Sequence, residues 1–204
     1  MCGIFGILLH IVDGMPDRCG LERSAGLMQH RGPDRQGIYV DEGIGLVHTR
    51  LSLLDLHPRS NQPFWDSENR YALVYNGEIY NYRELRSELE EQGIDFNTTS
   101  DTEVLLESLI HYGAEATLRR LEGMFAFALY DTRECLLTLA RDRFGIKPLY
   151  IYDQRDSFVF ASEIAAMRPW IRFEPDLLSI AAYLENQRQG LANGFSFFKG
   201  IKIA

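Results

Sequence analysis

Cysteine is scarce in this chain: only positions 2, 19 and 135 carry it among 204 residues. An odd number of cysteines without paired spacing argues against a disulfide framework and favours a reducing, cytoplasmic setting. Long apolar runs are also missing, because the longest interior run covers residues 124–130 whereas a membrane helix needs about 20 residues. Residues 4–12 resemble the core of a signal peptide, but no basic segment precedes them and no small-residue cleavage site follows them. We therefore expect neither a membrane span nor secretion.

An excess of positive charge is absent as well. The formal net charge is −8, with 21 basic and 29 acidic residues, which argues against binding to nucleic acid or to an anionic membrane. The five histidines and three cysteines show no metal-ligand spacing, so we expect no metal site. Neither GxxxxGK[ST] nor GxGxxG occurs, so the chain offers no phosphate-binding loop. We expect no cofactor to be bound by these residues.

What the chain does contain is ordinary for a globular protein, with 46% hydrophobic and 25% charged residues. Its length fits one domain, or one domain with a tail. Apolar periodicity predicts strands over 3–9, 44–48, 50–56, 71–75, 124–130, 135–140, 149–152 and 158–161, and helices over 17–29, 162–168 and 176–186. Residues 124–130 are apolar without alternation, which is typical of a strand covered on both faces. The pattern favours an α+β domain of stacked layers over a parallel βαβ sheet.

Two more helices are predicted from their ends. Asn81 with Glu84 and Ser100 with Glu103 both have the capping-box spacing, in which an N-cap residue is followed three positions later by a glutamate. Gly93 and Gly113 supply the corresponding C-terminal stops, and a polar loop is expected over 57–68.

Cys2 is the first candidate for chemistry. If the initiator methionine is removed, this residue carries both a thiol, with a pKa of about 8.5, and a free α-amine, with a pKa of about 7.7–8.0. Such an amine can take the proton of its own side chain, so this kind of nucleophile needs no histidine. The alternative interpretation is an ordinary terminal strand that happens to begin with cysteine. The catalytic interpretation requires a chain without Met1.

A few polar residues interrupt otherwise regular elements. Arg50 lies between two predicted apolar strands, where an arginine is costly unless it is paired, and its guanidinium is suited to a carboxylate. Asn76-Gly77-Glu78 directly follows a predicted strand, although Asn-Gly is also a strong hairpin signal. Asp101 lies at a predicted helix start, where capping explains it as well as ligand binding does. These residues alone suggest a cysteine-dependent hydrolase of a small polar molecule.

Eight motifs together resemble the class II glutamine amidotransferase domain, and within it the glutaminase half of glutamine-hydrolysing asparagine synthetases. They follow the family order and cover nearly the whole chain. They read MCGIFGI (1–7), HRGPD (30–34), HTRLSLLDL (48–56), NGEIYNYRELR (76–86), SDTEVLL (100–106), GMFAFALYD (123–131), RDRFGIKPLY (141–150) and FASEIAAM (160–167). The HRGPD and NGEIYN motifs distinguish the chain from hexosamine-phosphate synthases and phosphoribosyl-pyrophosphate amidotransferases, which carry different residues at these positions.

The resemblance implies an N-terminal nucleophile hydrolase fold, a four-layer αββα sandwich of two stacked, mainly antiparallel sheets. It also implies that Cys2 attacks the side-chain amide of glutamine, with its own α-amine as base. Asn76, through its side-chain amide, and Gly77, through its backbone N–H, would form the oxyanion hole.

The resemblance further implies how the substrate is held and what the chain serves. Arg50 would bind the α-carboxylate of glutamine, and Asp101, with Glu78 nearby, its α-ammonium. We expect one amidotransferase domain over residues 2–204. The SGGxDS-type loop of the family's synthetase domain does not occur here, so ATP and magnesium enter only with a synthetase domain or partner.

Several alternatives stay open at this level. The chain could be a fragment or a separate subunit, and it could form a homodimer. It could be a non-catalytic interaction domain of a synthetase complex, or a hydrolase of another amide. The acceptor of the ammonia could be aspartate or a substrate of a polysaccharide or natural-product pathway.

Overall fold

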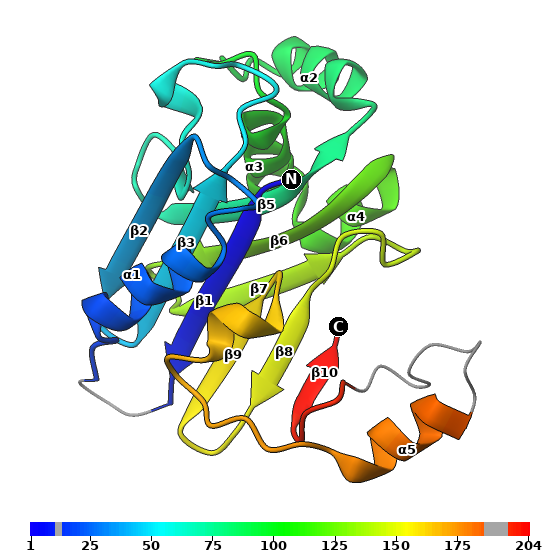
Figure 1. The fold of residues 1–204 in the computed structure, drawn as a ribbon. Helices are drawn as coiled ribbons and strands as arrows, with labels where there is room; N and C mark the ends of the chain where they lie inside the picture. Colours follow the sequence, from blue (N-terminus) through cyan, green and yellow to red (C-terminus); the bar gives the residue numbers. More distant parts are fainter. Residues whose placement is uncertain (11–13, 186–195) are drawn as a thin grey trace.

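Two antiparallel β-sheets packed face to face form the centre of the molecule, and a computed structural model describes residues 1–10, 14–185 and 196–204 (Figure 1). The first sheet has the strand order β10-β8-β9-β1-β3-β2. Its strands are β1 (Gly3–Leu9), β2 (Arg35–Asp41), β3 (Ile44–Arg50), β8 (Tyr150–Asp153), β9 (Ser157–Ala161) and β10 (Ile201–Ile203). The second sheet has the order β4-β5-β6-β7. Its strands are β4 (Phe64–Trp65), β5 (Tyr71–Ile79), β6 (Gly123–Asp131) and β7 (Leu136–Arg141).

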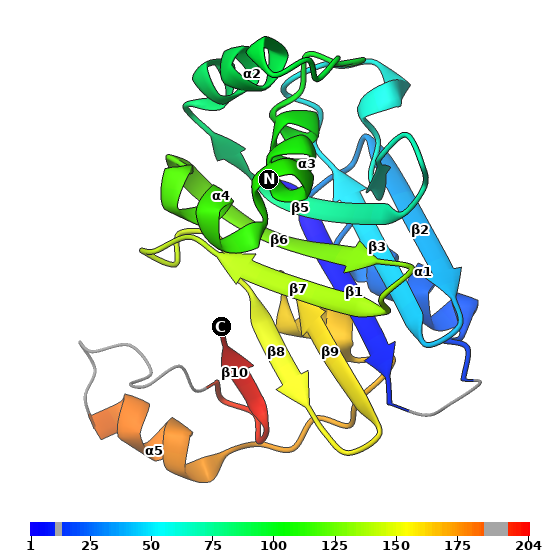
Figure 2. The same ribbon diagram turned by 180° about the vertical axis from the view of Figure 1, so that it is seen from behind.

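Helices cover the outer faces of both sheets. They are α1 (Arg18–Leu27), α2 (Tyr82–Glu91), α3 (Asp101–Tyr112) and α4 (Ala114–Arg120). A further helix, α5 (Leu177–Glu185), lies away from both sheets near β10, and none of its residues is buried (Figure 1). Two short 3₁₀ turns are η1 (Pro58–Ser60) and η2 (Ile164–Met167). The α1 helix and η2 pack on the first sheet, and α2, α3 and α4 pack on the second, as the view from behind shows (Figure 2). Helix, sheet, sheet and helix therefore form four layers, which confirms the predicted αββα sandwich.

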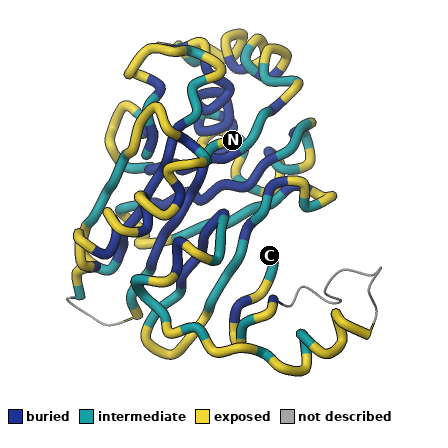
Figure 3. Tube along the Cα trace, in the orientation of Figure 1, coloured by how far each residue is buried: buried dark blue, intermediate teal, exposed yellow. Residues whose placement is uncertain are grey.

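Three apolar cores hold these layers together, and burial is concentrated in the central strands β1, β3, β5 and β6 and in α3 (Figure 3). The β6 strand explains the apolar run that lacks alternation. Its Phe125 and Phe127 belong to the core beneath the helices, while Ala126, Ala128 and Tyr130 face the other sheet. Both faces of β6 are thus covered, as the sequence predicts.

Several predictions of strands and helices need correction. The strand predicted over 50–56 does not form, because Arg50 is the last residue of β3 and residues 51–57 form a loop. The β5 strand continues to Ile79, so Asn76 and Gly77 lie inside a strand and the hairpin interpretation is wrong. The β2 and β10 strands and the α4 helix were not predicted, and the loop expected over 57–68 contains η1 and the short strand β4. The helix predicted over 162–168 is only the short η2 turn. The α5 helix agrees with its prediction, except that residue 186 lies outside the described residues.

The capping predictions are half right. Ser100 caps α3, since its hydroxyl accepts from the Thr102 N–H, but Glu103 turns back to Thr98 instead of Ser100. Asn81 makes no side-chain cap on α2. Its amide instead donates to the Arg120 carbonyl and accepts from the Glu122 N–H, which ties the start of α2 to the end of α4.

The predicted C-terminal ends of these two helices are confirmed. Gly93 and Gly113 have φ of +86° and +79°, in the region that favours glycine. No helix in the described ranges is long and apolar enough to cross a membrane.

Candidate functional site

One cavity brings together all six residues that the sequence singles out. Cys2, Arg50, Asn76, Gly77, Glu78 and Asp101 line the same space of about 150 Å³. They come from the chain segment before β1, from the end of β3, from the end of β5 and from the first residue of α3.

Strand pairing places the thiol next to the arginine. Gly3 pairs with Thr49, so Cys2 lies one step further along, opposite Arg50. Side chains alternate along a strand, and Ile4, two residues after Cys2, belongs to the core between the sheets. Cys2 and Arg50 therefore face the second sheet, where β5 carries Asn76 and Gly77.

The Cys2 thiol is partly buried and contacts the loop that follows β3. The Leu51 N–H donates to Sγ over 3.4 Å, and Sγ lies 3.7 Å from the Leu51 carbonyl oxygen. Burial raises the pKa of the Cys2 thiol above its ordinary value, outweighing the Leu51 N–H and the charge of Arg50, which lower it. A thiol in this setting needs a base to become a nucleophile.

The outer edge of β5 presents backbone donors to this cavity. On β6, the Phe125 carbonyl accepts from the Asp142 N–H, and the Phe125 N–H donates to the Asp142 carboxylate. Phe125 therefore makes no backbone hydrogen bond to Gly77, its partner on β5, and the N–H and C=O of Gly77 point away from β6. The Tyr75 N–H points to the same edge and donates to Gln62, and the Ile79 N–H there donates to Asp101. Within the part of the chain that the structure describes, the Gly77 N–H between them meets no acceptor.

Asn76 supplies a second free donor beside the first. Its Nδ2 is buried and has no hydrogen-bond partner among the described residues. Position 77 accepts only glycine, because a Cβ there would lie 2.4 Å from the Met124 carbonyl oxygen and 2.7 Å from the Tyr75 ring. Two unsatisfied N–H donors on the wall of a cavity that holds a thiol form the arrangement that stabilises an oxyanion.

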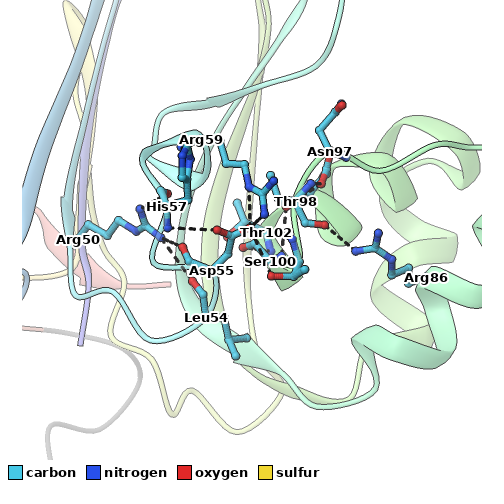
Figure 4. Close-up of polar contacts among 12 residues, drawn as sticks. Arg50, Leu54, Asp55, His57, Arg59, Arg86, Asn97, Thr98, Ser100 and Thr102 are labelled. Carbon is cyan, nitrogen blue, oxygen red and sulfur yellow. Dashed lines mark hydrogen bonds and ion pairs between the residues drawn. The ribbon is translucent and has the colours of Figure 1, made fainter.

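Arg50 is a buried cation that meets only neutral oxygens (Figure 4). Its two terminal nitrogens donate to the carbonyls of Leu54, Asp55 and His57 and, over 2.7 Å, to the side-chain oxygen of Asn61. No acidic side chain of the described residues forms an ion pair with it. The guanidinium is held in place but its charge is unmatched.

Asp101 is the matching buried anion on the same cavity. One carboxylate oxygen accepts from the Tyr75 hydroxyl over 2.8 Å and from the Ile79 N–H over 3.1 Å. Burial raises the pKa of the Asp101 carboxyl, against these two hydrogen bonds, and the nearby charge of Glu78 raises it further. Asp101 likewise has no cationic partner in the described ranges.

Comparison with known proteins identifies the family. The model of the glutamine amidotransferase domain matches residues 1–203. The chain belongs to this amidotransferase family. It is 45% identical to asparagine synthetase [glutamine-hydrolyzing] 1 of Bacillus subtilis over 165 residues, covering 80% of this chain and 26% of the relative. It is 40% identical to asparagine synthetase B [glutamine-hydrolyzing] of Escherichia coli, covering 84% and 31%.

Solved structures agree with this assignment. The glutamine phosphoribosylpyrophosphate amidotransferase of B. subtilis superposes with a TM-score of 0.68 at 27% identity, covering 82% of this chain and 43% of that one. The chain is thus an asparagine-synthetase-like glutamine amidotransferase domain, and it spans about a quarter to a third of the length of the two synthetases.

Further contacts of this amidotransferase domain fix the backbone of Cys2. Arg31, from the HRGPD motif, donates from Nε to the Cys2 carbonyl over 2.9 Å. Its Nη1 forms a 2.8 Å ion pair with Glu163, which also contacts His30. The motif alone gives no role for Arg31, because the two residues that it contacts lie 29 and 132 positions away in the sequence.

The loop after β3 is fastened to the start of α3. The Asp55 carboxylate accepts from the Thr99 N–H over 2.8 Å and pairs with Arg59 (Figure 4). Although burial opposes it, these donors lower the pKa of Asp55 to about 2. The same loop supplies the carbonyl oxygens that hold Arg50. Asp55 therefore connects the loop that binds Arg50 to the helix that begins at Asp101.

No group of three or more His, Cys, Asp or Glu side chains within the described ranges could hold a metal ion.

Gln62, Tyr75 and Lys147 also line the cavity and were not predicted from the sequence. Their residue types give no signal of a site, because only the fold brings them to it.

Proposed function

We propose that this amidotransferase domain, over residues 2–204, hydrolyses glutamine to glutamate and ammonia through a thioester on Cys2. The observation that carries the proposal is the pair of unmatched buried charges, Arg50 and Asp101, on the cavity that holds the thiol. A free α-amino acid carries one carboxylate and one ammonium, so it satisfies both charges at once. Glu78, which lines the same wall, adds negative charge on the ammonium side.

The reaction follows from the groups on the cavity wall. The α-amine of Cys2 takes the thiol proton, and the thiolate forms a bond to the side-chain carbonyl carbon of glutamine. Asn76 Nδ2 and the Gly77 N–H stabilise the resulting oxyanion. The C–N bond breaks as the amine returns its proton to the leaving ammonia, which yields the thioester. A water molecule, deprotonated by the same amine, cleaves the thioester and releases glutamate.

This mechanism requires the chain that begins at Cys2. While Met1 is attached, the nitrogen of Cys2 belongs to an amide and cannot act as a base. Met1 also lines the cavity, and its sulfur lies 3.4 Å from Lys147 Nζ. Removal of Met1 therefore both creates the base and opens the site beside the thiol.

We further propose that the ammonia serves an amidation like that of asparagine synthetase, with ATP and magnesium bound by a synthetase domain or partner. The similarity to two glutamine-hydrolysing asparagine synthetases supports this acceptor. An acceptor in a polysaccharide or natural-product pathway would use the same glutaminase chemistry.

The test measures glutamate and ammonia release from glutamine by wild type, Cys2→Ala and Cys19→Ala. Mass spectrometry of each preparation first establishes that Met1 is absent. We expect release by wild type and by Cys19→Ala, whose cysteine is exposed and remote from the cavity, and none by Cys2→Ala. Equal release by Cys2→Ala would exclude the thioester. No release by a wild-type chain shown to begin at Cys2 would favour a non-catalytic interaction domain.

A further inference from the structure

A completely buried histidine connects the two sheets directly behind the candidate oxyanion hole. His48 lies on β3 and pairs with Ile4 of β1, so its side chain faces the second sheet. Its Nε2 is 3.1 Å from the Tyr75 carbonyl oxygen on β5. His48 itself does not line the cavity.

The contact acts on the peptide group that leads into the oxyanion hole. The Tyr75 carbonyl and the Asn76 nitrogen belong to one planar peptide unit, so holding that oxygen fixes the orientation of the Asn76 backbone. Tyr75 is also held at its N–H, by Gln62 over 2.6 Å, and at its hydroxyl, by Asp101 over 2.8 Å. His48 therefore supplies the third point of attachment for the residue before Asn76.

The chemistry of the contact defines what the histidine contributes. A carbonyl oxygen only accepts, so Nε2 must carry the hydrogen and donate it. The other ring nitrogen, Nδ1, is buried and has no hydrogen-bond partner among the described residues. An unpaired buried nitrogen is unfavourable, and an apolar side chain of similar size would avoid it. The contribution that an apolar residue could not make is the Nε2–H donated to Tyr75.

We propose that His48 is a positioning residue for the oxyanion hole. By holding the Tyr75–Asn76 peptide, it directs Asn76 Nδ2 and, one residue further, the Gly77 N–H toward the carbonyl that Cys2 attacks. This role rests on the proposed glutaminase function. His48 transfers no proton to the substrate and contacts none of the reacting atoms.

The test compares His48→Leu, which fills space without a donor, with His48→Gln, whose amide nitrogen can take the place of Nε2–H. Loss of one oxyanion donor typically lowers the rate ~10²–10³-fold, and misplacement by ~1 Å costs ~10²-fold. We therefore expect kcat to fall roughly 10- to 100-fold in His48→Leu. The KM for glutamine should stay near the wild-type value, because Arg50 and Asp101 are untouched. His48→Gln should recover most of kcat.

A second readout separates positioning from a general loss of structure. Glutamate γ-semialdehyde serves as an inhibitor, because the Cys2 thiol adds to its aldehyde carbon. The oxygen of the resulting adduct occupies the oxyanion hole. Its inhibition constant should weaken in His48→Leu by the same factor as kcat/KM, while inhibition by glutamate stays unchanged. Ser24→Ala is the matched control, because Ser24 is equally buried and bonds the Ala166 carbonyl in the layer on the far side of the first sheet. It should lose stability but not kcat.

The outcomes distinguish the two proposals. A wild-type chain that lacks Met1 and releases no glutamate overturns the proposed function and the positioning role with it. An active wild type with an unchanged kcat in His48→Leu overturns the positioning role alone. If Ser24→Ala loses kcat in proportion to its loss of stability, the positioning role is overturned as well. If His48→Leu does not fold, His48→Asn provides the same test, since its shorter amide does not reach the Tyr75 carbonyl.

Discussion

The burial of His48 makes a quantitative prediction about acid stability that does not depend on catalysis. Complete burial, aided by the charge of Arg50, lowers the pKa of His48 from 6.5 to about 3, against the hydrogen bond to Tyr75 that raises it. Between these two values the unfolded chain binds a proton at this position and the folded chain does not. Stability therefore rises with pH across this range and is lost as the pH falls below about 6.5.

The size of the loss follows from linkage. At pH 5 the unfolded histidine is almost fully protonated, and this stabilises the unfolded state by about 2 kcal/mol relative to pH 7. A glutamine at position 48 does not titrate, so His48→Gln lacks this contribution. The difference between wild type and His48→Gln isolates the effect, because all other ionisable groups are common to both chains.

The assay is urea unfolding of both chains at pH 7.0 and pH 5.0. We expect the unfolding free energy of wild type to fall by about 2 kcal/mol more than that of His48→Gln, which corresponds to a midpoint shift of about 1 M urea. Equal pH dependence in the two chains would refute the reasoning. It would mean that water reaches the ring or that His48 is protonated in the folded protein.

Two further predictions concern the buried groups of the cavity. Burial raises the pKa of Asp101, so its ionisation at neutral pH destabilises the ligand-free fold. Asp101→Asn should therefore raise the melting temperature at pH 7 and increase the KM for glutamine more than tenfold. A lower melting temperature would contradict this reasoning. Asn76→Ala should lower kcat roughly 10²–10³-fold in steady-state glutaminase assays with little change in KM, and an unchanged kcat would remove its Nδ2 from the oxyanion hole.

Residue chemistry explains why Cys2, Arg50, Asn76 and Gly77 could be singled out from the sequence. Asp101 had an equally good explanation as a capping residue, and Glu78 gained a role only from the family resemblance. A cysteine at position 2, an arginine between apolar segments and Asn-Gly after an apolar run are each unusual for their local element. The motif order then linked them to one family. The interpretation of Asn76 and Gly77 still needed the structure, because a strand that continues to Ile79 and a hairpin have the same local sequence signal.

The residues that the sequence did not reveal act through long-range contacts. Apolar periodicity tells which face of a strand a side chain occupies, but not which distant group meets the strand's edge. Gln62 and His48 lie 13 and 27 positions from Tyr75, and neither residue type is unusual where it stands. The same limitation explains Asn81: its capping-box spacing is genuine, but Arg120 and Glu122 take the amide for a tertiary contact.

The loop at 51–57 shows a second limitation of pattern reading. The apolar composition of residues 50–56 predicts a strand, since nothing in the local sequence shows that backbone carbonyls will be needed by the guanidinium of Arg50. In the folded chain the carbonyls of Leu54, Asp55 and His57 turn toward Arg50 and are therefore unavailable to a neighbouring strand. The buried cation, and not local propensity, decides the conformation of this segment.

The cavity is best understood through the groups that the fold leaves without partners. Arg50 lacks an anion, Asp101 lacks a cation, and Asn76 Nδ2 and the Gly77 N–H lack acceptors within the described residues. Each such group destabilises the empty fold, so packing alone does not explain why four of them line one cavity. A glutamine molecule offers a carboxylate, an ammonium and a carbonyl oxygen, which together satisfy all four. In the proposed complex the charges would hold one end of glutamine and the donors the other, so the site would select its substrate by the length of chain between them.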